Sequence, residues 1–209
     1  MKNNLATTKT IGIVGLGLIG GSLGLSFQKL GYRVLGLTHK PNTAIRARER
    51  GLANLVSTDQ KILGECPVVI LALPLSQLLK PESKLIDSLH PDAVITDVGS
   101  VKTPVLKIWE QLHPNFIASH PMAGKDLAGV DAGIENLFHG KPWIATPNER
   151  TNPKALEVIK GLAISLGCNW LTAEANAHDQ AVALISHLPV LVAAALLKTA
   201  DHEKNESIL

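Results

Sequence analysis

TIGIVGLGLIG, residues 10–20, is an apolar run that breaks into three glycines spaced as GxGxxG. Such a run predicts a buried strand that ends in a tight turn, and the uncharged stretch after the turn predicts a helix that continues to residue 30. Gly15 would permit the turn, Gly17 would let a ligand approach the backbone, and Gly20 would let the helix pack closely on the strand. The stretch therefore predicts the first strand–helix unit of a doubly wound α/β fold.

The same glycine turn predicts a dinucleotide-binding site. A helix N-terminus offers free N–H groups and a partial positive charge, which together suit a pyrophosphate. GxGxxG alone can be a purely structural turn, but here it follows a strand, opens a helix and precedes a second predicted strand at residues 32–37. The residues expected to contact the dinucleotide are those of the turn and of the end of the fourth predicted strand: Gly15, Leu16, Gly17, Leu18, Ile19, Gly20, Leu73 and Pro74.

Strand and helix signals alternate over most of the chain, which predicts a mostly parallel sheet built from βαβ units. Further strands are predicted at residues 53–56, 67–73, 93–98 and 115–119, with weaker ones at 141–145 and 169–172. Helices are predicted at residues 43–51 and 153–166. The run at 67–73 is too continuously apolar for a half-exposed strand, so we expect it inside the sheet.

The strand signal stops at Glu174, and residues 175–200 form one helical pattern that Pro189 interrupts. Proline inside a helix removes a backbone donor and usually bends the helix. We therefore expect a doubly wound (Rossmann) dinucleotide-binding domain at residues 9–173, followed by the start of an all-helical domain at residues 174–209. Because the chain ends within a helical stretch, we expect the helical domain to be truncated.

Composition and charge narrow the class of protein. The net charge of +2, without any basic block, argues against nucleic acid as a partner. Cys66 and Cys168 have neither disulfide nor metal-ligand spacing, so we expect buried thiols in a reducing compartment and no metal site. Residues 181–197 contain His187 and Pro189 and fall short of the usual membrane span, so a buried helix is expected there. With no export signal visible, we expect a cytoplasmic protein without a membrane partner.

The end of the second predicted strand indicates which dinucleotide is bound. NAD enzymes usually carry an acidic residue there that binds the adenosine ribose. This chain reads Thr38-His39-Lys40, with no Asp or Glu. Hydroxyl, imidazole and ammonium groups can hold a 2′-phosphate that a carboxylate would repel, so we expect NADP, with NAD as the less favoured cofactor. The other interpretation is that His39 and Lys40 form only a solvated turn.

Four motifs together resemble the prephenate/arogenate dehydrogenases, and among these the cyanobacterial type of arogenate dehydrogenase. They are GLGLIGGS at residues 15–22, DVGSVK at 97–102, SHPMAG at 119–124 and HDQAVALISHLP at 178–189. The resemblance covers nearly the whole chain. It implies oxidative decarboxylation of arogenate or prephenate in tyrosine biosynthesis, with hydride passing to the nicotinamide. It also implies a homodimer formed through the helical domain.

The resemblance assigns roles to individual residues. His120 matches the family's catalytic histidine, the proton acceptor for the ring hydroxyl, and imidazole ordinarily titrates near pKa 6.5. Ser100 matches the serine that holds the same hydroxyl. Without the resemblance His120 would read as a structural residue and Ser100 as a helix N-cap. Thr103, followed by proline, is the better predicted cap, which leaves Ser100 free for a ligand.

The remaining candidates are expected to surround the substrate: Lys125, Asp126 and His187. His178 and His187, nine residues apart, fall on opposite faces of an ideal helix, so a joint site is not expected. Helix capping by Asp179 at the start of its own helix, together with interdomain packing, is the alternative interpretation of the His178–Asp179 pair.

The chain departs from the family pattern at three places. Val190 replaces a second histidine of the SHLPH motif, Lys125-Asp126 replace Thr-Glu after SHPMAG, and no arginine follows Arg150 to bind the substrate carboxylate. The first two differences favour arogenate as substrate. Two alternatives remain open, a β-hydroxyacid or 6-phosphogluconate type of dehydrogenase and a non-catalytic NADP-binding fragment.

Overall fold

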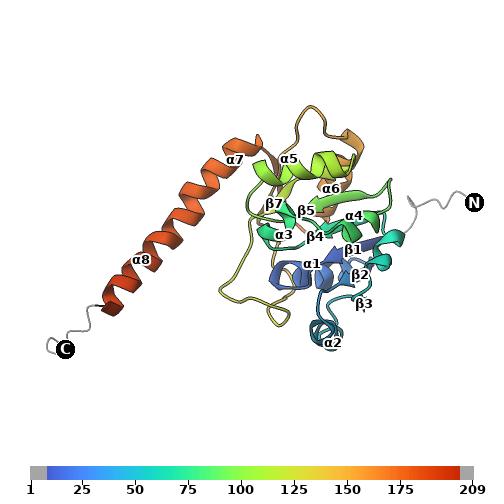
Figure 1. Ribbon diagram of the computed structural model, residues 1–209, viewed down its shortest axis with the longest axis horizontal. Coiled ribbons are helices and arrows are strands. Elements are labelled where there is room, and N and C mark those ends of the chain that lie inside the picture. The colour runs from blue at the N-terminus through green and yellow to red at the C-terminus, as the bar shows by residue number, and fades with distance from the viewer. Residues whose placement is uncertain (1–8, 203–209) are drawn as a thin grey trace, which may run out of the picture.

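The computed structural model describes residues 9–202. A six-stranded parallel sheet in the order β3-β2-β1-β4-β5-β6 forms its centre, and helices cover both faces (Figure 1). The strands are β1 (Thr10–Val14), β2 (Arg33–Leu37), β3 (Leu55–Ser57), β4 (Val68–Leu71), β5 (Val94–Asp97) and β6 (Phe116–Ile117). The predicted doubly wound fold is confirmed.

Two apolar layers hold the helices against the sheet. One layer packs α1 (Leu18–Lys29), α2 (Pro41–Glu49) and α6 (Pro153–Ser165) on one face. The other layer packs η2 (Gln60–Glu65), α3 (Leu75–Leu79), α4 (Ser83–Asp87) and α5 (Thr103–Leu112) on the opposite face. β4 contributes to both, because successive side chains of a strand point to opposite faces. Val68 and Ile70 join the first layer, and Val69 and Leu71 join the second.

The order of the strands reverses between β1 and β4, and this topological switch point opens a crevice at the carboxyl edge of the sheet. The ends of three strands meet there. Gly15 N–H donates to Leu37 O at 2.9 Å, and Ala72 N–H donates to Val14 O at 2.8 Å. The glycine turn is therefore held at the mouth of the crevice by backbone hydrogen bonds from both sides.

The predicted strand at residues 115–119 is in fact two strands on two sheets. β6 ends at Ile117, and β7 (Ser119–Pro121) starts a second sheet with β8 (Pro142–Ala145) and β9 (Asn169–Thr172). The chain leaves the main sheet at Ala118, whose carbonyl accepts a hydrogen bond from Thr146 N–H at 3.0 Å. This change of sheet carries His120 away from the main sheet and onto β7, which pairs with β8.

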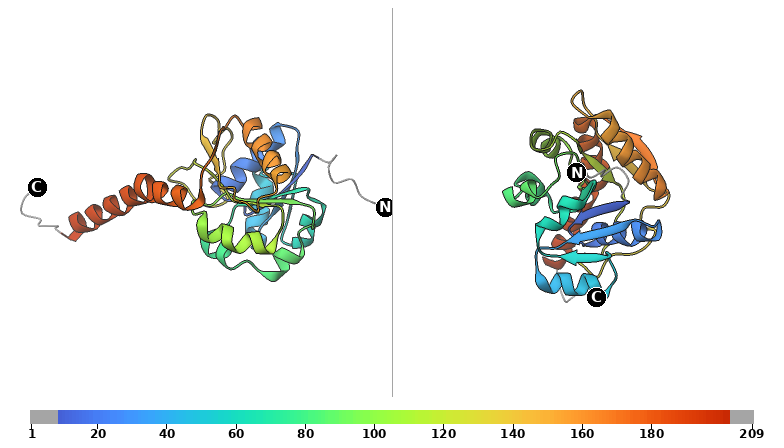
Figure 2. Two further views of the ribbon diagram at one scale, coloured as in Figure 1. Left: turned by 90° about the horizontal axis from the view of Figure 1, so that it is seen from above. Right: turned by 90° about the vertical axis from the view of Figure 1, so that its right-hand side faces the viewer.

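The C-terminal helices leave the sheet domain as one long rod (Figures 1 and 2). The rod consists of α7 (Ala175–Val182), the π-helical segment η3 (Ala183–His187) and α8 (Leu188–His202). The expectation of a buried helix is wrong for these residues, because only 6% of the most apolar 18-residue window of Ala175–Ala200 is buried. By length and composition alone this helix could cross a membrane, although core helices of water-soluble proteins pass the same criterion.

Candidate active site

The glycine turn places the backbone where only glycine fits. Gly15 has φ +91°, and a Cβ at this position would lie 2.3 Å from Ala72 O. A Cβ at Gly20 would lie 1.8 Å from Gly15 O, so α1 packs against the turn at backbone contact distance. At Gly17 the nearest neighbouring atom is Gly129 O at 4.0 Å. The turn thus combines two tightly packed glycines with one that leaves room for a ligand.

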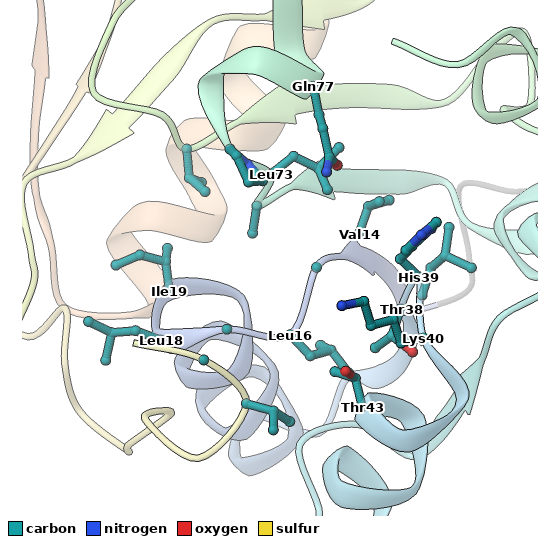
Figure 3. Close-up of a pocket in the computed structure, with 18 of the residues that line it drawn as sticks. Val14, Leu16, Leu18, Ile19, Thr38, His39, Lys40, Thr43, Leu73 and Gln77 are labelled. Carbon is teal, nitrogen blue, oxygen red and sulfur yellow. The ribbon is translucent and has the colours of Figure 1, made fainter. Parts of the chain in front are cut away.

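A cavity of about 1020 Å³ lies in front of this turn, between the ends of β1 and β2 on one side and the start of α3 on the other. Figure 3 shows Thr38, His39 and Lys40 on one side, with Leu73 and Gln77 across from them. All predicted dinucleotide contacts line this cavity except Gly20, which lies behind the turn: Gly15, Leu16, Gly17, Leu18, Ile19, Thr38, His39, Lys40, Leu73 and Pro74.

Thr38 gives the cavity an unsatisfied polar group. The side chain is only 4% exposed, and its Oγ1 has no hydrogen-bond partner among residues 9–202. A buried hydroxyl without a partner is costly unless a ligand completes its hydrogen bonds. The glycine cradle, the helix N-terminus and this free hydroxyl together fit the pyrophosphate and ribose of a dinucleotide.

Sequence reasoning missed the segment that closes the cavity. Residues 127–131, which come shortly after the SHPMAG motif, line it beside the glycine turn, with Gly129 O 4.0 Å from the position of a Cβ at Gly17. Arg50 holds this segment by donating to Val130 O at 2.9 Å and to Gly133 O at 2.8 Å, and Arg46 pairs with Asp131 at 2.6 Å. The segment has no strand or helix periodicity, so only the three-dimensional contacts with α2 reveal its position.

His120 on β7 is hydrogen-bonded to a residue of α7. Its Nδ1 lies 3.1 Å from Nε2 of His178, and Nδ1 of His178 lies 2.9 Å from Oδ1 of Asp179. Asp179 also accepts from the backbone N–H groups of Lys102 at 2.7 Å and Thr103 at 2.8 Å. Three motifs that are remote in sequence, at residues 97–102, 119–124 and 178–189, therefore form one connected cluster.

This cluster corrects two expectations. Asp179 caps the N-terminus of α5, a neighbouring helix, instead of the start of its own helix. Thr103 is not the side-chain cap of α5, and its Oγ1 is buried without a partner in the described part of the chain. His178 is a member of the site that sequence reasoning did not choose. His178 is also buried, as expected from the alternative interpretation that it packs between the two domains.

A buried ion pair connects the end of β5 with the start of β7, the strand that carries His120. Lys102 and Asp97 have side chains that are 0% exposed and are in direct contact. Lys102 Nζ also donates to Ser119 O at 2.7 Å, while Asp97 accepts from Gly99 N–H at 2.9 Å and Ser119 N–H at 3.3 Å. Burial raises the pKa of Asp97 and lowers the pKa of Lys102, and in each case the charge of the partner acts against that shift.

His120 is neutral over the physiological range. Burial lowers its pKa to about 3, and the charges of Lys102, His178 and His187 act in the same direction, whereas Asp179 opposes them. The expectation that His120 titrates near the ordinary imidazole value is therefore wrong. A neutral imidazole is the form that can accept a proton.

The other predicted substrate contacts form no hydrogen bond with this cluster within residues 9–202, and three of the four are exposed. Ser100 is exposed in the loop between β5 and α5, and Lys125 and Asp126 are exposed in the segment that follows β7. His187 is half-buried at the end of η3 and is close enough for its charge to influence His120. A π-helix turns by less per residue than an α-helix, so η3 moves His187 away from the face opposite His178.

Comparison with known proteins gives the family. A family model described as the nucleotide-binding domain of prephenate dehydrogenase matches residues 23–171, and one described as its dimerization domain matches residues 174–208. The chain belongs to the prephenate dehydrogenase family. This family membership excludes the alternative that the chain is a β-hydroxyacid or 6-phosphogluconate type of dehydrogenase.

Individual members of the prephenate dehydrogenase family show how much of the chain is shared. It is 35% identical to the prephenate dehydrogenase of Bacillus subtilis, covering 94% of this chain and 55% of that relative. The chain is 40% identical in sequence to Synechocystis arogenate dehydrogenase. The match to its crystal structure has a TM-score of 0.83 and covers 96% of this chain and 72% of that one. The structure of A. aeolicus prephenate dehydrogenase in complex with hydroxyphenyl propionate and NAD+ matches with 30% sequence identity and a TM-score of 0.88. This match covers 94% of this chain and 71% of that one. The chain spans about half the length of the Bacillus subtilis relative.

Proposed function

We propose that this protein catalyses the NADP-dependent oxidative decarboxylation of arogenate or prephenate in tyrosine biosynthesis. The observation that carries the proposal is the placement of His120. In a chain of this family, the half-buried imidazole of His120 follows Ser119, whose backbone is hydrogen-bonded to Asp97 and Lys102 at the two ends of the loop after β5. Val98 of that loop also lines the dinucleotide cavity. An acceptor for a hydroxyl proton thus stands at the same edge of the fold as the cavity.

The proposed reaction needs one proton acceptor and one hydride acceptor. The nicotinamide of the bound dinucleotide supplies the hydride acceptor. His120 takes the proton of the ring hydroxyl as hydride leaves the carbon that bears it, and Ser100 orients the hydroxyl. The ring carboxylate departs as carbon dioxide, and its bonding electrons complete the aromatic ring. Lys125, Asp126 and His187 are proposed to contact the rest of the substrate.

The experiment that tests this function is a spectrophotometric assay with both substrates and both cofactors. We expect reduction of NADP on addition of arogenate, with prephenate turned over more slowly. Val190 supports this preference because an aliphatic side chain stands where a histidine could pair with a carboxylate, and Asp126 supports it because a carboxylate favours the amino group of arogenate. Equal or better turnover of prephenate would contradict the preference. Binding of NADP without turnover of either substrate would favour the non-catalytic alternative.

The preference for NADP is proposed from the end of β2. Lys40 and His39 lie beside the buried hydroxyl of Thr38 on the cavity wall, and no carboxylate follows β2 (Figure 3). A 2′-phosphate would find a hydroxyl, an imidazole and an ammonium group there. The A. aeolicus relative was solved with NAD+, so the choice between the two cofactors needs its own test in this chain.

Thr38→Asp is expected to invert the cofactor preference. A carboxylate at this position would accept hydrogen bonds from the ribose hydroxyls of NAD and repel the 2′-phosphate of NADP. Binding of each dinucleotide, measured by calorimetry, provides the readout, and Thr43→Asp on the same cavity wall is the matched control for added charge. Tighter binding of NAD than of NADP by the unmodified protein would overturn the proposal.

The exposed apolar rod α7–α8 is proposed to pack against a second copy of this chain. Its side chains include Leu191, Leu196 and Leu197, which are all exposed, and its residues match the dimerization domain of the family. We propose that the domain boundary lies between residues 173 and 174 and that the protein is a cytoplasmic homodimer. A monomeric mass in light scattering at micromolar concentration would contradict the dimer.

A further inference from the structure

The hydrogen bonds of His120 determine which of its two ring nitrogens carries the proton. A neutral imidazole has one nitrogen that donates and one that accepts, and the partner of each nitrogen decides which is which. His120, His178 and Asp179 form a linear series with contacts of 3.1 and 2.9 Å. The series ends at a carboxylate whose role as donor or acceptor can be determined from its other partners.

Asp179 can act only as an acceptor here. Its two oxygens receive the N–H groups of Lys102 and Thr103, which can donate but not accept. Burial acts against ionisation of Asp179, but hydrogen bonds from His178, Lys102 and Thr103 outweigh it and lower its pKa. An ionised carboxylate has no proton to give, so Nδ1 of His178 must donate to it.

In the uncharged form of the His178 ring, a proton on Nδ1 leaves Nε2 as an acceptor, so Nδ1 of His120 must donate to it. The only nitrogen of His120 left with a lone pair is Nε2. We infer that Asp179, acting through His178, fixes His120 in the Nδ1–H tautomer and so makes Nε2 the proton acceptor.

This arrangement makes His178 and Asp179 positioning residues, and their catalytic importance rests on the proposed function. It also couples the two parts of the chain. His120 belongs to β7, whereas His178 and Asp179 belong to α7, which Asp179 attaches to the N-terminus of α5. The orientation of the base therefore depends on α7 being docked on α5.

The tautomer can be measured directly by long-range proton–nitrogen NMR of the histidine rings, at about pH 8 where an ordinary imidazole is neutral. We expect His120 and His178 both to show the Nδ1–H form, which free histidine in water populates less. His113 is an internal control with the opposite arrangement. Its Nδ1 accepts from Asn115 N–H at 3.3 Å, so its Nε2 must donate to His90 O at 3.2 Å. Observation of the Nε2–H form for His120 would overturn the inference.

Two substitutions of His178 separate positioning from packing. His178→Phe keeps a ring but removes both hydrogen bonds, and we expect His120 to revert to the Nε2–H form. His178→Gln offers an acceptor towards His120 and a donor towards Asp179, and we expect it to retain the Nδ1–H form. A His178→Phe protein in which His120 keeps the Nδ1–H form would also overturn the inference.

Where the wild-type protein turns over arogenate or prephenate, its enzymatic activity provides a second, independent test of the inference. We expect kcat to fall roughly 10²-fold in His178→Phe, with NADP affinity unchanged and with partial recovery in His178→Gln. Glu174→Ala is the matched control for Asp179→Ala, because the Glu174 carboxylate also caps a helix, accepting from Asn176 and Ala177 N–H, but is hydrogen-bonded to no histidine ring within the described part of the chain. Only Asp179→Ala should change the tautomers. If the tautomers are as inferred but neither substrate is turned over, the proposed function fails and the inference stands.

Discussion

His120→Asn is expected to lower kcat by roughly 10²–10⁴-fold, the usual contribution of a positioned acid or base. The affinity for NADP should stay unchanged, because the cavity that would hold the dinucleotide is lined by the glycine turn and not by His120. Asparagine can still donate a hydrogen bond to His178, so the substitution removes the proton acceptor with little change to the cluster. Stopped-flow measurement of NADPH formation and calorimetry of NADP binding provide the two readouts.

The pH profile adds a second check on the role of His120. With a folded-state pKa of about 3, the ring remains neutral far below its ordinary value, so kcat/KM should not fall through an ionisation near pH 6.5. The unfolded chain binds the proton more readily than the folded one, so stability falls as pH drops from about 6.5 towards the folded value. His120→Asn should therefore lose less thermal stability on acidification than the wild type.

A purely structural role for His120 would give a different pattern. The variant would then lose thermal stability at neutral pH and NADP binding together with activity. Retention of more than roughly a tenth of the wild-type kcat, where a base should contribute at least a hundredfold, would show that His120 is not the proton acceptor.

Local sequence features predicted residues that the fold brings together around one cavity. The turn at residues 15–20 and the strand end at Thr38 lie close together in the chain, and the rules for strand ends in parallel sheets then place Leu73 beside them. All three line one cavity. Its closing segment, residues 127–131, was missed because it has no periodicity and is positioned by Arg46 and Arg50, far away in sequence.

The partners of His120 could not be predicted from helix periodicity. Ideal 3.6-residue geometry places His178 and His187 on opposite faces, whereas the π-helical segment η3 between them changes that relation. The role of Asp179 was missed for a similar reason. A helix-capping carboxylate is normally sought next to its own helix, but Asp179 lies 76 positions from Thr103, whose N–H it accepts. Contacts of this kind depend on tertiary packing and leave no local pattern.

Lys102→Met is expected to destabilise the fold by about 3–5 kcal/mol, because it leaves the buried Asp97 carboxylate without its counter-charge. For a chain of this size that corresponds to a fall in Tm of about 10 °C. Methionine matches the length and apolar stem of lysine, so lost packing contributes little. Lys107→Met, within the helix α5 that follows Lys102, is the matched control, since Lys107 is exposed and its replacement should change stability by less than about 0.5 kcal/mol.

Two further measurements assign the loss to the uncompensated charge of Asp97. The double variant Asp97→Asn/Lys102→Met removes both charges and should recover most of the stability, because a neutral buried pair has no desolvated ion left unpaired. The loss in the single variant should also shrink as pH falls. Burial raises the folded-state pKa of Asp97 above its unfolded value, so protonation favours the folded state in the acidic range and that stabilisation disappears as pH rises. If the loss of stability in Lys102→Met is independent of pH and persists in the double variant, it arises instead from the lost contact between Lys102 and Ser119 O. The ion pair would then contribute nothing measurable to the stability of the fold.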